Sequence, residues 1–269
     1  MRHEITVIAV VGRKKTGKTY VIERLIERLR SAGYSVATAK HIHDPEFSMD
    51  REGTDTWRHL ATGAEVVAAV SEKETSLIFK TGYRDFSTDV LINHLEGVDI
   101  LLLEGFSEKI LADERVAKII CGKKADDYRF YANRIMGKIL GFYAAHTTGS
   151  NAGSPISLES LLEKTVEYVR ELEVSKLLKT LPHLDCGKCG YQTCREMAEA
   201  IYVGKRSVEG CPIFKERLPL KLKLTVNGTE VPIQHFVSNI IRSAVLGMVA
   251  TLKGVEINGN EEVAVDIAL

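Results

Sequence analysis

The sequence predicts an α/β protein in which a parallel-sheet domain precedes two smaller pieces. An apolar run, residues 5–11, leads into Gly-Arg-Lys-Lys-Thr-Gly-Lys-Thr at residues 12–19 and then into an amphipathic helical pattern. A second run, residues 100–103, is apolar at every position, which is typical of a strand covered on both faces of a sheet. Four of the five cysteines lie between residues 186 and 211, which marks a separate small module.

Residues 12–19 follow the spacing G-x-x-x-x-G-K-[ST]. The strand before this segment and the helix after it indicate a phosphate-binding loop rather than a chance match. Glycines let successive N–H groups turn inward around an anion, and the helix N-terminus adds further donors. We expect Lys18 to reach the β- and γ-phosphates and the Thr19 hydroxyl to bind Mg²⁺. The sequence therefore predicts a P-loop NTPase domain that binds a nucleoside triphosphate through Gly12, Arg13, Lys14, Lys15, Thr16, Gly17, Lys18 and Thr19.

Composition limits the class of protein further. A chain of 269 residues can form one large domain or two smaller ones. Its 36 basic and 36 acidic residues balance, so net charge gives no argument for binding nucleic acid or an anionic membrane. No apolar run reaches the roughly 18 residues that span a bilayer, and the first residues show no signal-peptide pattern. We expect a cytoplasmic protein without a nucleic-acid or membrane partner.

The segment after the loop predicts a helix and a second parallel strand. Apolar residues recur every three or four positions over residues 21–29, which gives a helix one stripe to pack on a sheet. Gly33 suits the end of this helix, and residues 35–39 then form the next strand of a βαβ unit. The strand ends at Lys40 and His41, at the edge where open α/β sheets bind ligands. Both residues are therefore candidates for the nucleotide site.

A polar segment, residues 47–63, follows and holds the only tryptophan. It predicts either a surface loop with a helix or a lid over the site. After it, the pattern predicts short strands at residues 65–70 and 76–80 and a helix at residues 84–95.

The apolar run at residues 100–103 ends in Glu104. Such a strand resembles a Walker B segment, which delivers a carboxylate near Mg²⁺ and the attacking water. Acidic residues are also common at strand ends without any such role. Because a phosphate loop lies upstream, we favour the functional interpretation and expect Glu104 to bind Mg²⁺ and to act in catalysis with Lys18.

A further apolar run, residues 116–121, precedes Lys123-Lys124-Ala125-Asp126. GTP-binding proteins carry [N/T]-K-x-D after a late strand, and its Asp accepts hydrogen bonds from guanine. Here Lys123 stands where Asn or Thr is expected, so a charged turn explains the segment nearly as well. Asp126 remains a candidate for reading the base.

Over residues 1 to about 173 the sequence resembles the molybdopterin-guanine dinucleotide biosynthesis protein B (MobB) family. Besides the phosphate loop, the resemblance rests on four ordered segments: Val36-Ala37-Thr38-Ala39-Lys40-His41, Asp55-Thr56-Trp57-Arg58-His59, Gly63-Ala64 and Leu103-Glu104-Gly105-Phe106. The resemblance implies a dimeric GTP-binding protein with weak hydrolysis, which partners an enzyme that attaches GMP to molybdopterin. It places Asp55 and Arg58 in a lid-like segment. Lys14 and Lys15 depart from the small polar residues that the family pattern leads us to expect.

The cysteine spacing is C-x₂-C-x₄-C, with the fourth cysteine after a short helix at about residues 195–203. Clustered cysteines in a cytoplasmic chain indicate metal ligands rather than disulfides. A [4Fe–4S] cluster needs four converging thiolates, and the glycines between them allow a tight wrap. Structural Zn²⁺ is the rival, although zinc sites more often pair two C-x₂₋₄-C knuckles. We favour a cluster held by Cys186, Cys189, Cys194 and Cys211.

This second stretch also resembles the four-cysteine iron–sulfur module of electron-transport and corrinoid iron–sulfur proteins. The resemblance implies a [4Fe–4S] cluster and a redox partner. Cys121, by contrast, stands alone in an apolar run, and we expect it to be a small buried core residue.

The last part of the chain predicts a small α+β piece without recognisable chemistry. We expect a hairpin with an Asn227-Gly228 turn, a helix at residues 235–252 and a closing strand at residues 262–269. We expect a P-loop domain at residues 1–155, a helical linker at 156–180, the iron–sulfur module at 181–217 and the α+β piece at 218–269. A non-catalytic adaptor, or a nucleotide-gated electron carrier outside molybdenum metabolism, is the alternative function.

Overall fold

The chain divides into two compact units, Met1–Leu172 and Glu173–Leu269. The computed structural model describes residues 4–80, 82–145, 154–217, 224–226, 229–231 and 235–252. The predicted closing strand at residues 262–269 and the predicted Asn227-Gly228 turn lie outside the described residues. Within the described residues, no helix combines the length and apolar character needed to cross a bilayer.

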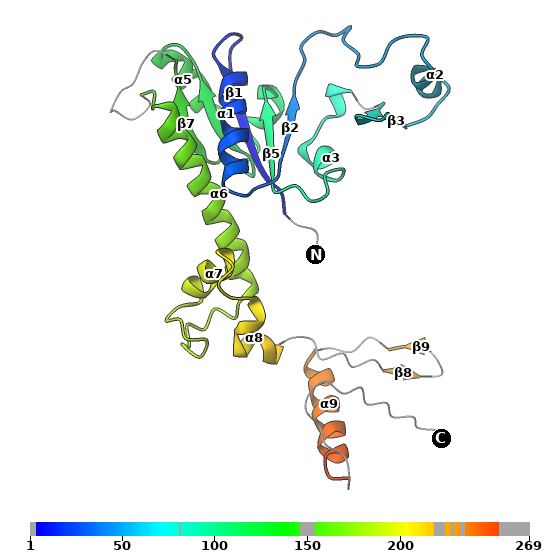
Figure 1. Ribbon diagram of the computed structural model, residues 1–269, viewed down its shortest axis with the longest axis vertical. Helices are drawn as coiled ribbons and strands as arrows, with labels where there is room; N and C mark the ends of the chain where they lie inside the picture. Colours follow the sequence, from blue (N-terminus) through cyan, green and yellow to red (C-terminus); the bar gives the residue numbers. More distant parts are fainter. Residues whose placement is uncertain are drawn as a thin grey trace. The chain divides into compact units, whose positions relative to one another are not determined.

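A five-stranded parallel sheet is the centre of the first unit (Figure 1). Its spatial order is β2-β5-β1-β6-β7. The strands are β1 (Thr6–Gly12), β2 (Val36–Lys40), β5 (Ile100–Glu104), β6 (Ala117–Cys121) and β7 (Ile139–Tyr143). The predicted strands of this sheet are confirmed to within a residue or two. β2 is parallel to β1, as expected, but β5 lies between them and pairs with both.

Helices cover both faces of this sheet. Alternate residues of β1 point to opposite faces, so Ile8 and Val10 pack against one layer while Ala9 and Val11 pack against the other. The first layer is made by α1 (Lys18–Ser31) and the start of α6 (Leu158–Thr180). The second is made by α3 (Thr88–Ile92), α4 (Ser107–Ile110) and α5 (Ala125–Ala132). Cys121 is fully buried in the first layer, as predicted.

The segment between β2 and β5 forms a smaller substructure. It contains α2 (Asp55–Ala61) and an antiparallel hairpin of β3 (Val66–Val70) and β4 (Thr75–Phe79). The predicted helix over residues 84–95 is wrong in extent. A 3₁₀ turn, η1 (Tyr83–Asp85), comes first, and α3 starts only at Thr88 because Phe86 and Ser87 are extended and the Ser87 hydroxyl caps the Val90 N–H.

The second unit contains the cysteines. Its elements are α7 (Cys194–Tyr202), η2 (Val208–Gly210), α8 (Pro212–Arg217), the hairpin β8 (Thr225–Val226) with β9 (Thr229–Glu230), and α9 (His235–Val249). Among the described residues, its buried apolar side chains are those of Val174, Leu181, Met197, Ala198, Ala200 and Cys211. The residues of α6 from Glu173 onward belong to this unit, while those before it belong to the first unit.

Candidate functional site

The phosphate loop connects β1 to α1 and adopts the backbone that its glycines predict. Lys15 has φ 60° and Gly17 has φ 87°, and Gly17 is the residue before the first turn of α1. The Thr16 hydroxyl donates to the Arg13 carbonyl over 2.9 Å and closes the loop internally. The loop therefore holds its N–H groups and the start of α1 around one concave region, as an anion site requires.

Gly12 is the position where no side chain fits. Its φ is 154°, and a Cβ added there would lie 2.1 Å from the carbonyl oxygen of Cys121 on β6. Real Cβ atoms do not approach a backbone atom so closely, so any other residue would push β1 and β6 apart. The first glycine of the motif is thus fixed by strand packing.

The Lys18 ammonium lies over the loop. It donates to the carbonyls of Gly12 and Arg13 over 3.0 and 2.7 Å. Burial lowers the pKa of Lys18, while the nearby Glu104 carboxylate acts in the opposite direction. A partly desolvated cation gains more from a polyanionic partner than an exposed one does.

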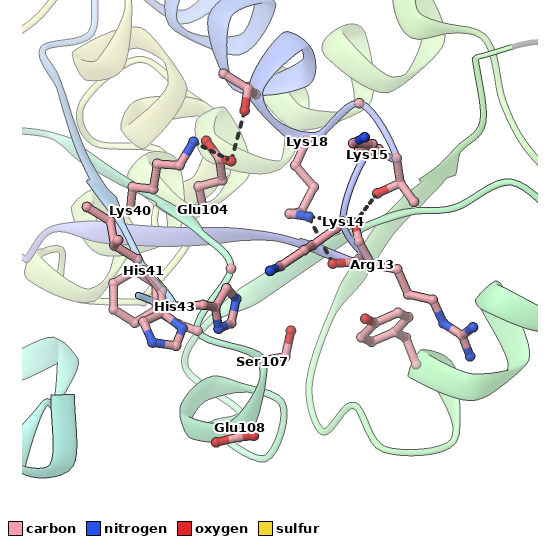
Figure 2. A pocket seen from close by; sticks show the side chains of 18 of the residues that line it. Arg13, Lys14, Lys15, Lys18, Lys40, His41, His43, Glu104, Ser107 and Glu108 are labelled. Atoms are coloured by element: carbon pink, nitrogen blue, oxygen red, sulfur yellow. Dashed lines mark hydrogen bonds and ion pairs between the residues drawn. The ribbon is translucent and has the colours of Figure 1, made fainter. Parts of the chain in front are cut away.

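Glu104 joins the loop to β2. Its Oε1 accepts from the Thr19 hydroxyl over 2.9 Å and lies 3.1 Å from Lys40 Nζ (Figure 2). The sheet explains this meeting, because Glu104 is in register with Val10 of β1 on one side and with Lys40 of β2 on the other. The carboxylate is only 12% exposed, against 56% for Lys40. Glu104 therefore lies beside Thr19, while its binding of Mg²⁺ and its catalytic role stay predictions.

A pocket of about 890 Å³ opens at this carboxyl edge of the sheet, as expected for an open α/β sheet. It is lined by residues 12–20, 40–44 and 104–108 with Tyr83 and Tyr131. Five of these lining residues are Lys or Arg and three are Asp or Glu, so its wall favours an anion. Lys14 and Lys15 both belong to the wall, and Lys14 extends toward the centre of the pocket (Figure 2).

Aromatic rings form the wall beyond β2. The His41 ring stacks on Tyr83 with centroids 3.8 Å apart and planes 8° apart, and His43 lies 4.2 Å from it. Burial, followed by the neighbouring His43, lowers the pKa of His41. His41 is therefore neutral at neutral pH, and it contributes to the pocket as a flat ring.

Arg13 points to α5. Its Nε lies 3.5 Å from Asp127 Oδ1, and its guanidinium lies over the Phe130 ring at 5.5 Å. Asp127 also accepts from the N–H groups of Lys123 and Lys124 over 2.9 and 3.2 Å. Those N–H groups, together with Arg13, hold the pKa of Asp127 below its usual value.

Asp126 does not line this pocket. Its side chain is 85% exposed and lies 3.5 Å from Arg129, one turn along α5. The carboxylate that contacts the segment after β6 is that of its neighbour, Asp127. Base reading by Asp126 stays a prediction.

Asp55 and Arg58 lie on α2 and form an exposed pair 3.7 Å apart. Neither lines the described pocket, and Figure 1 shows α2 beside the hairpin rather than over the phosphate loop. Their lid role also stays a prediction. Tyr83, Phe106, Ser107, Glu108 and Tyr131 also line the pocket, but none of them was predicted as a site residue. Residues 105–108 could have been predicted from their position directly after the strand that ends in Glu104.

The four clustered cysteines line one small hollow in the second unit, together with apolar side chains such as Leu181, Met197 and Ile213. All are free thiols. Gly187 and Gly190, with φ 69° and 89°, turn the chain between the first three. Cys194 begins α7, where the Thr193 hydroxyl caps the helix and Asp185 accepts the Cys194 N–H over 2.6 Å.

This donor set fits the cluster that the cysteine spacing predicts. Four thiols around one hollow match the ligand demand of a cuboidal cluster, and a helix N-terminus stabilises a thiolate at Cys194. As the side chains of the described residues stand, no group of three His, Cys, Asp or Glu is arranged to hold a single metal ion. Binding would therefore require thiols on the loop to turn toward the hollow, which glycine-flanked residues can do at small cost.

Comparison with known proteins matches both parts of the chain. Residues 7–133 match the family model described as "Molybdopterin guanine dinucleotide synthesis protein B" (MobB), and residues 181–213 match one described as "Putative Fe-S cluster". These two ranges contain the phosphate loop and all four clustered cysteines.

Similar proteins carry related names. A Methanocaldococcus jannaschii protein named "Putative molybdopterin-guanine dinucleotide biosynthesis adapter protein" is 27% identical over 262 residues, which covers 97% of this chain and 98% of that protein. The "Molybdopterin-guanine dinucleotide biosynthesis adapter protein" of Haemophilus influenzae is 28% identical over 111 residues, 40% of this chain and 61% of that protein. A crystal structure of molybdopterin-guanine biosynthesis protein B aligns at 21% identity and TM-score 0.45, covering 61% of this chain and 99% of that one. On the two family matches, the chain carries a domain of the MobB family at residues 7–133 and a module of the iron–sulfur cluster family at residues 181–213.

Proposed function

We propose that this protein is an adapter of molybdopterin guanine dinucleotide biosynthesis that binds GTP with Mg²⁺ in the phosphate-loop pocket. The observation that carries the proposal is the cationic pocket around Lys18, built on a MobB domain. The names of the similar adapter proteins support the pathway.

Different residues of the pocket would bind the phosphates and the Mg²⁺. The loop N–H groups and Lys18 would hold the phosphates, and Lys14 adds positive charge over the pocket. Thr19 and Glu104 supply a hydroxyl and a carboxylate at one corner, a donor set that suits Mg²⁺, which takes few protein ligands and the remainder from phosphate and water. Bound Mg²⁺ would neutralise phosphate charge.

Hydrolysis without a partner should be slow. Arg13 lines the pocket, but its guanidinium group pairs with Asp127 on α5. Arg58 lies on the exposed α2, outside the pocket lining, so neither side chain is placed as a stabilising arginine. The partner we expect is the enzyme that joins GMP to molybdopterin. We also expect a homodimer.

The adapter role is tested with the partner guanylyltransferase. Dinucleotide formation by the partner enzyme is measured in the presence of wild type or of Lys18→Ala. Each protein is loaded beforehand either with GTP or with a non-hydrolysable GTP analogue. We expect wild type to stimulate formation and Lys18→Ala to fail. Full stimulation with the analogue would assign the protein a binding role and remove hydrolysis from the proposal. Equal stimulation by Lys18→Ala and wild type would refute nucleotide-dependent action.

For the second unit we propose a [4Fe–4S] cluster held by Cys186, Cys189, Cys194 and Cys211, which would supply one-electron chemistry to a redox partner. Anaerobic purification with iron, sulfide and zinc analysis tests this. The expected result is iron and sulfide in equal amounts, with visible charge-transfer absorption. Zinc without iron would establish the tetrahedral Cys₄ zinc site instead.

A further inference from the structure

A second pocket, of about 390 Å³, adjoins the phosphate pocket at the end of β2. Its volume falls within the range of roughly 300–1,000 Å³ typical of small-molecule sites. The two pockets share Lys40, His41, Ile42, Tyr83 and Phe106 as lining residues. A ligand in one pocket would therefore contact the wall of the other.

The walls of the second pocket present flat aromatic faces. His41 and Tyr83 are stacked 3.8 Å apart, and Phe86 stacks on Phe106 with centroids 4.3 Å apart. Phe47 also lines this pocket, and its side chain is 47% exposed. The stacking contacts fix the rings in place, and a flat ring system can stack on the faces that they present to the pocket.

Polar groups are few and lie at defined places. Lys40 is the only Lys, Arg, Asp or Glu among the described residues that line this pocket. His94 Nδ1 lies 2.7 Å from the Val90 carbonyl; because a carbonyl oxygen only accepts, Nδ1 donates this hydrogen bond and Nε2 is left for another partner. The wall therefore offers one cation for an anion and one ring nitrogen of His94 among mostly apolar and aromatic side chains.

This pocket lies at the γ-phosphate end of a nucleotide held by the loop. In phosphate-loop proteins the lysine and the Mg²⁺-binding hydroxyl meet the β- and γ-phosphates, and the Walker B carboxylate lies near the attacking water. Thr19 and Glu104 occupy those positions here, and Lys40 contacts the same Glu104 oxygen. The base lies at the opposite end of a triphosphate, so it cannot occupy the pocket beyond Lys40. A ligand in this pocket would therefore be a second molecule.

We propose that this pocket binds a pterin phosphate, with its bicyclic ring against the aromatic wall and its phosphate at Lys40. The identity of the ring rests on the proposed function, since a pathway that joins a pterin to a guanine nucleotide supplies both molecules. The pocket's aromatic walls and single cation match a flat nitrogen heterocycle that carries one anionic group.

The test uses the full chain and neopterin monophosphate, whose pterin fluorescence reports binding by anisotropy, with saturating GTP and Mg²⁺ present and absent. We expect saturable binding in both conditions and weaker binding of unphosphorylated neopterin. Phe47→Ala and His94→Ala should each weaken binding about tenfold, the scale of one lost stacking contact. Met49→Ala and Glu96→Ala, exposed neighbours outside the pocket lining, should bind like wild type.

Three results would overturn the proposal: no saturable binding at millimolar ligand, wild-type affinity in both pocket variants, or full competitive displacement of neopterin monophosphate by GTP. GTP calorimetry on the same preparations keeps the two proposals separate. Pterin phosphate binding without GTP binding would refute the proposed GTP-binding function and support the pterin phosphate site. GTP binding without pterin phosphate binding would refute the pterin phosphate site and leave the proposed function standing.

Discussion

Single residues at the carboxyl edge of the sheet decide what the pocket can hold. Glu104 contacts Thr19 and Lys40 because β5 lies between β1 and β2. Gly12 lets β1 turn into the loop beneath the Cys121 carbonyl. The sequence motif predicted the identity of these residues. It could not predict their partners, because partners depend on strand order.

Substituting Gly12 with alanine should disrupt the loop. The new Cβ would collide with the Cys121 carbonyl oxygen, so β1 and β6 must separate. We expect a loss of more than about 1 kcal/mol of unfolding free energy, measured by urea denaturation, together with loss of nucleotide binding. Gly82→Ala is the control for stability, since Gly82 has φ −86° and open space around its Cα. Equal stability of Gly12→Ala and wild type would contradict the packing argument.

Asp127, rather than Asp126, should contribute to stability. Its folded-state pKa is lowered, so its contribution is present above the unfolded-state pKa and is lost as pH falls through the folded-state pKa. Asp127→Asn should cost about 1–2 kcal/mol at neutral pH, and the difference from wild type should shrink in acid.

Urea denaturation at a series of pH values measures this effect. Asp126→Asn, with an 85% exposed side chain, should match wild type throughout. A pH-independent difference for Asp127→Asn would show that its carboxylate charge has no role.

At the scale of elements, periodicity predicted the strands and α1 well because each lies against a continuous core. The region between β2 and β5 was predicted less well. A single helix was predicted over residues 84–95, but the structure has η1 followed by α3. The cap at Ser87 and the contact of Phe86 with Phe106 interrupt the helix. Tyr83 lines both pockets and lies in this irregular segment, so no periodic pattern predicted it as a site residue.

The beginning of α6 should belong energetically to the first unit. Leu161 is fully buried in the layer of α1, and its side chain lies against the space above Gly141 of β7. Leu161→Ala should therefore destabilise the sheet by about 2–5 kcal/mol, seen as faster hydrogen exchange of β1 and β7 amides. Glu163→Ala, on the exposed side of the same helix, should leave exchange unchanged. Unchanged exchange in Leu161→Ala would place this helix outside the sheet's cooperative unit.

At the scale of the whole molecule, the phosphate-loop pocket lies in the first unit and the four clustered cysteines line a hollow in the second. Both groups of residues could be found in the sequence, since each belongs to a local motif whose members are close in the chain. The pocket beyond Lys40 could not be predicted, because its walls come from residues 40–47, 79–94 and 106, which only the fold brings together. Asp55, Arg58 and Asp126 were predicted as site residues only because short segments resemble known motifs. None of them lines the described pockets.

The five cysteines should differ in chemistry. Burial raises the pKa of Cys121 to about 12, so it stays a thiol at neutral pH, whereas Cys186 is exposed. Anaerobic iodoacetamide labelling of metal-free folded protein, read by mass spectrometry, should modify Cys186 and spare Cys121. After iron reconstitution, Cys211→Ser should lose iron and Cys121→Ser should retain it. Equal iron loss in both would contradict the proposed ligand set.

Calorimetric titration of the full chain with GTP and Mg²⁺ measures whether the phosphate-loop pocket binds a nucleotide. We expect saturable binding that Lys18→Ala weakens at least about tenfold, the loss expected for charge-assisted hydrogen bonds to phosphate. Absence of saturable heat with either GTP or ATP, or equal affinity of Lys18→Ala and wild type, would contradict this expectation.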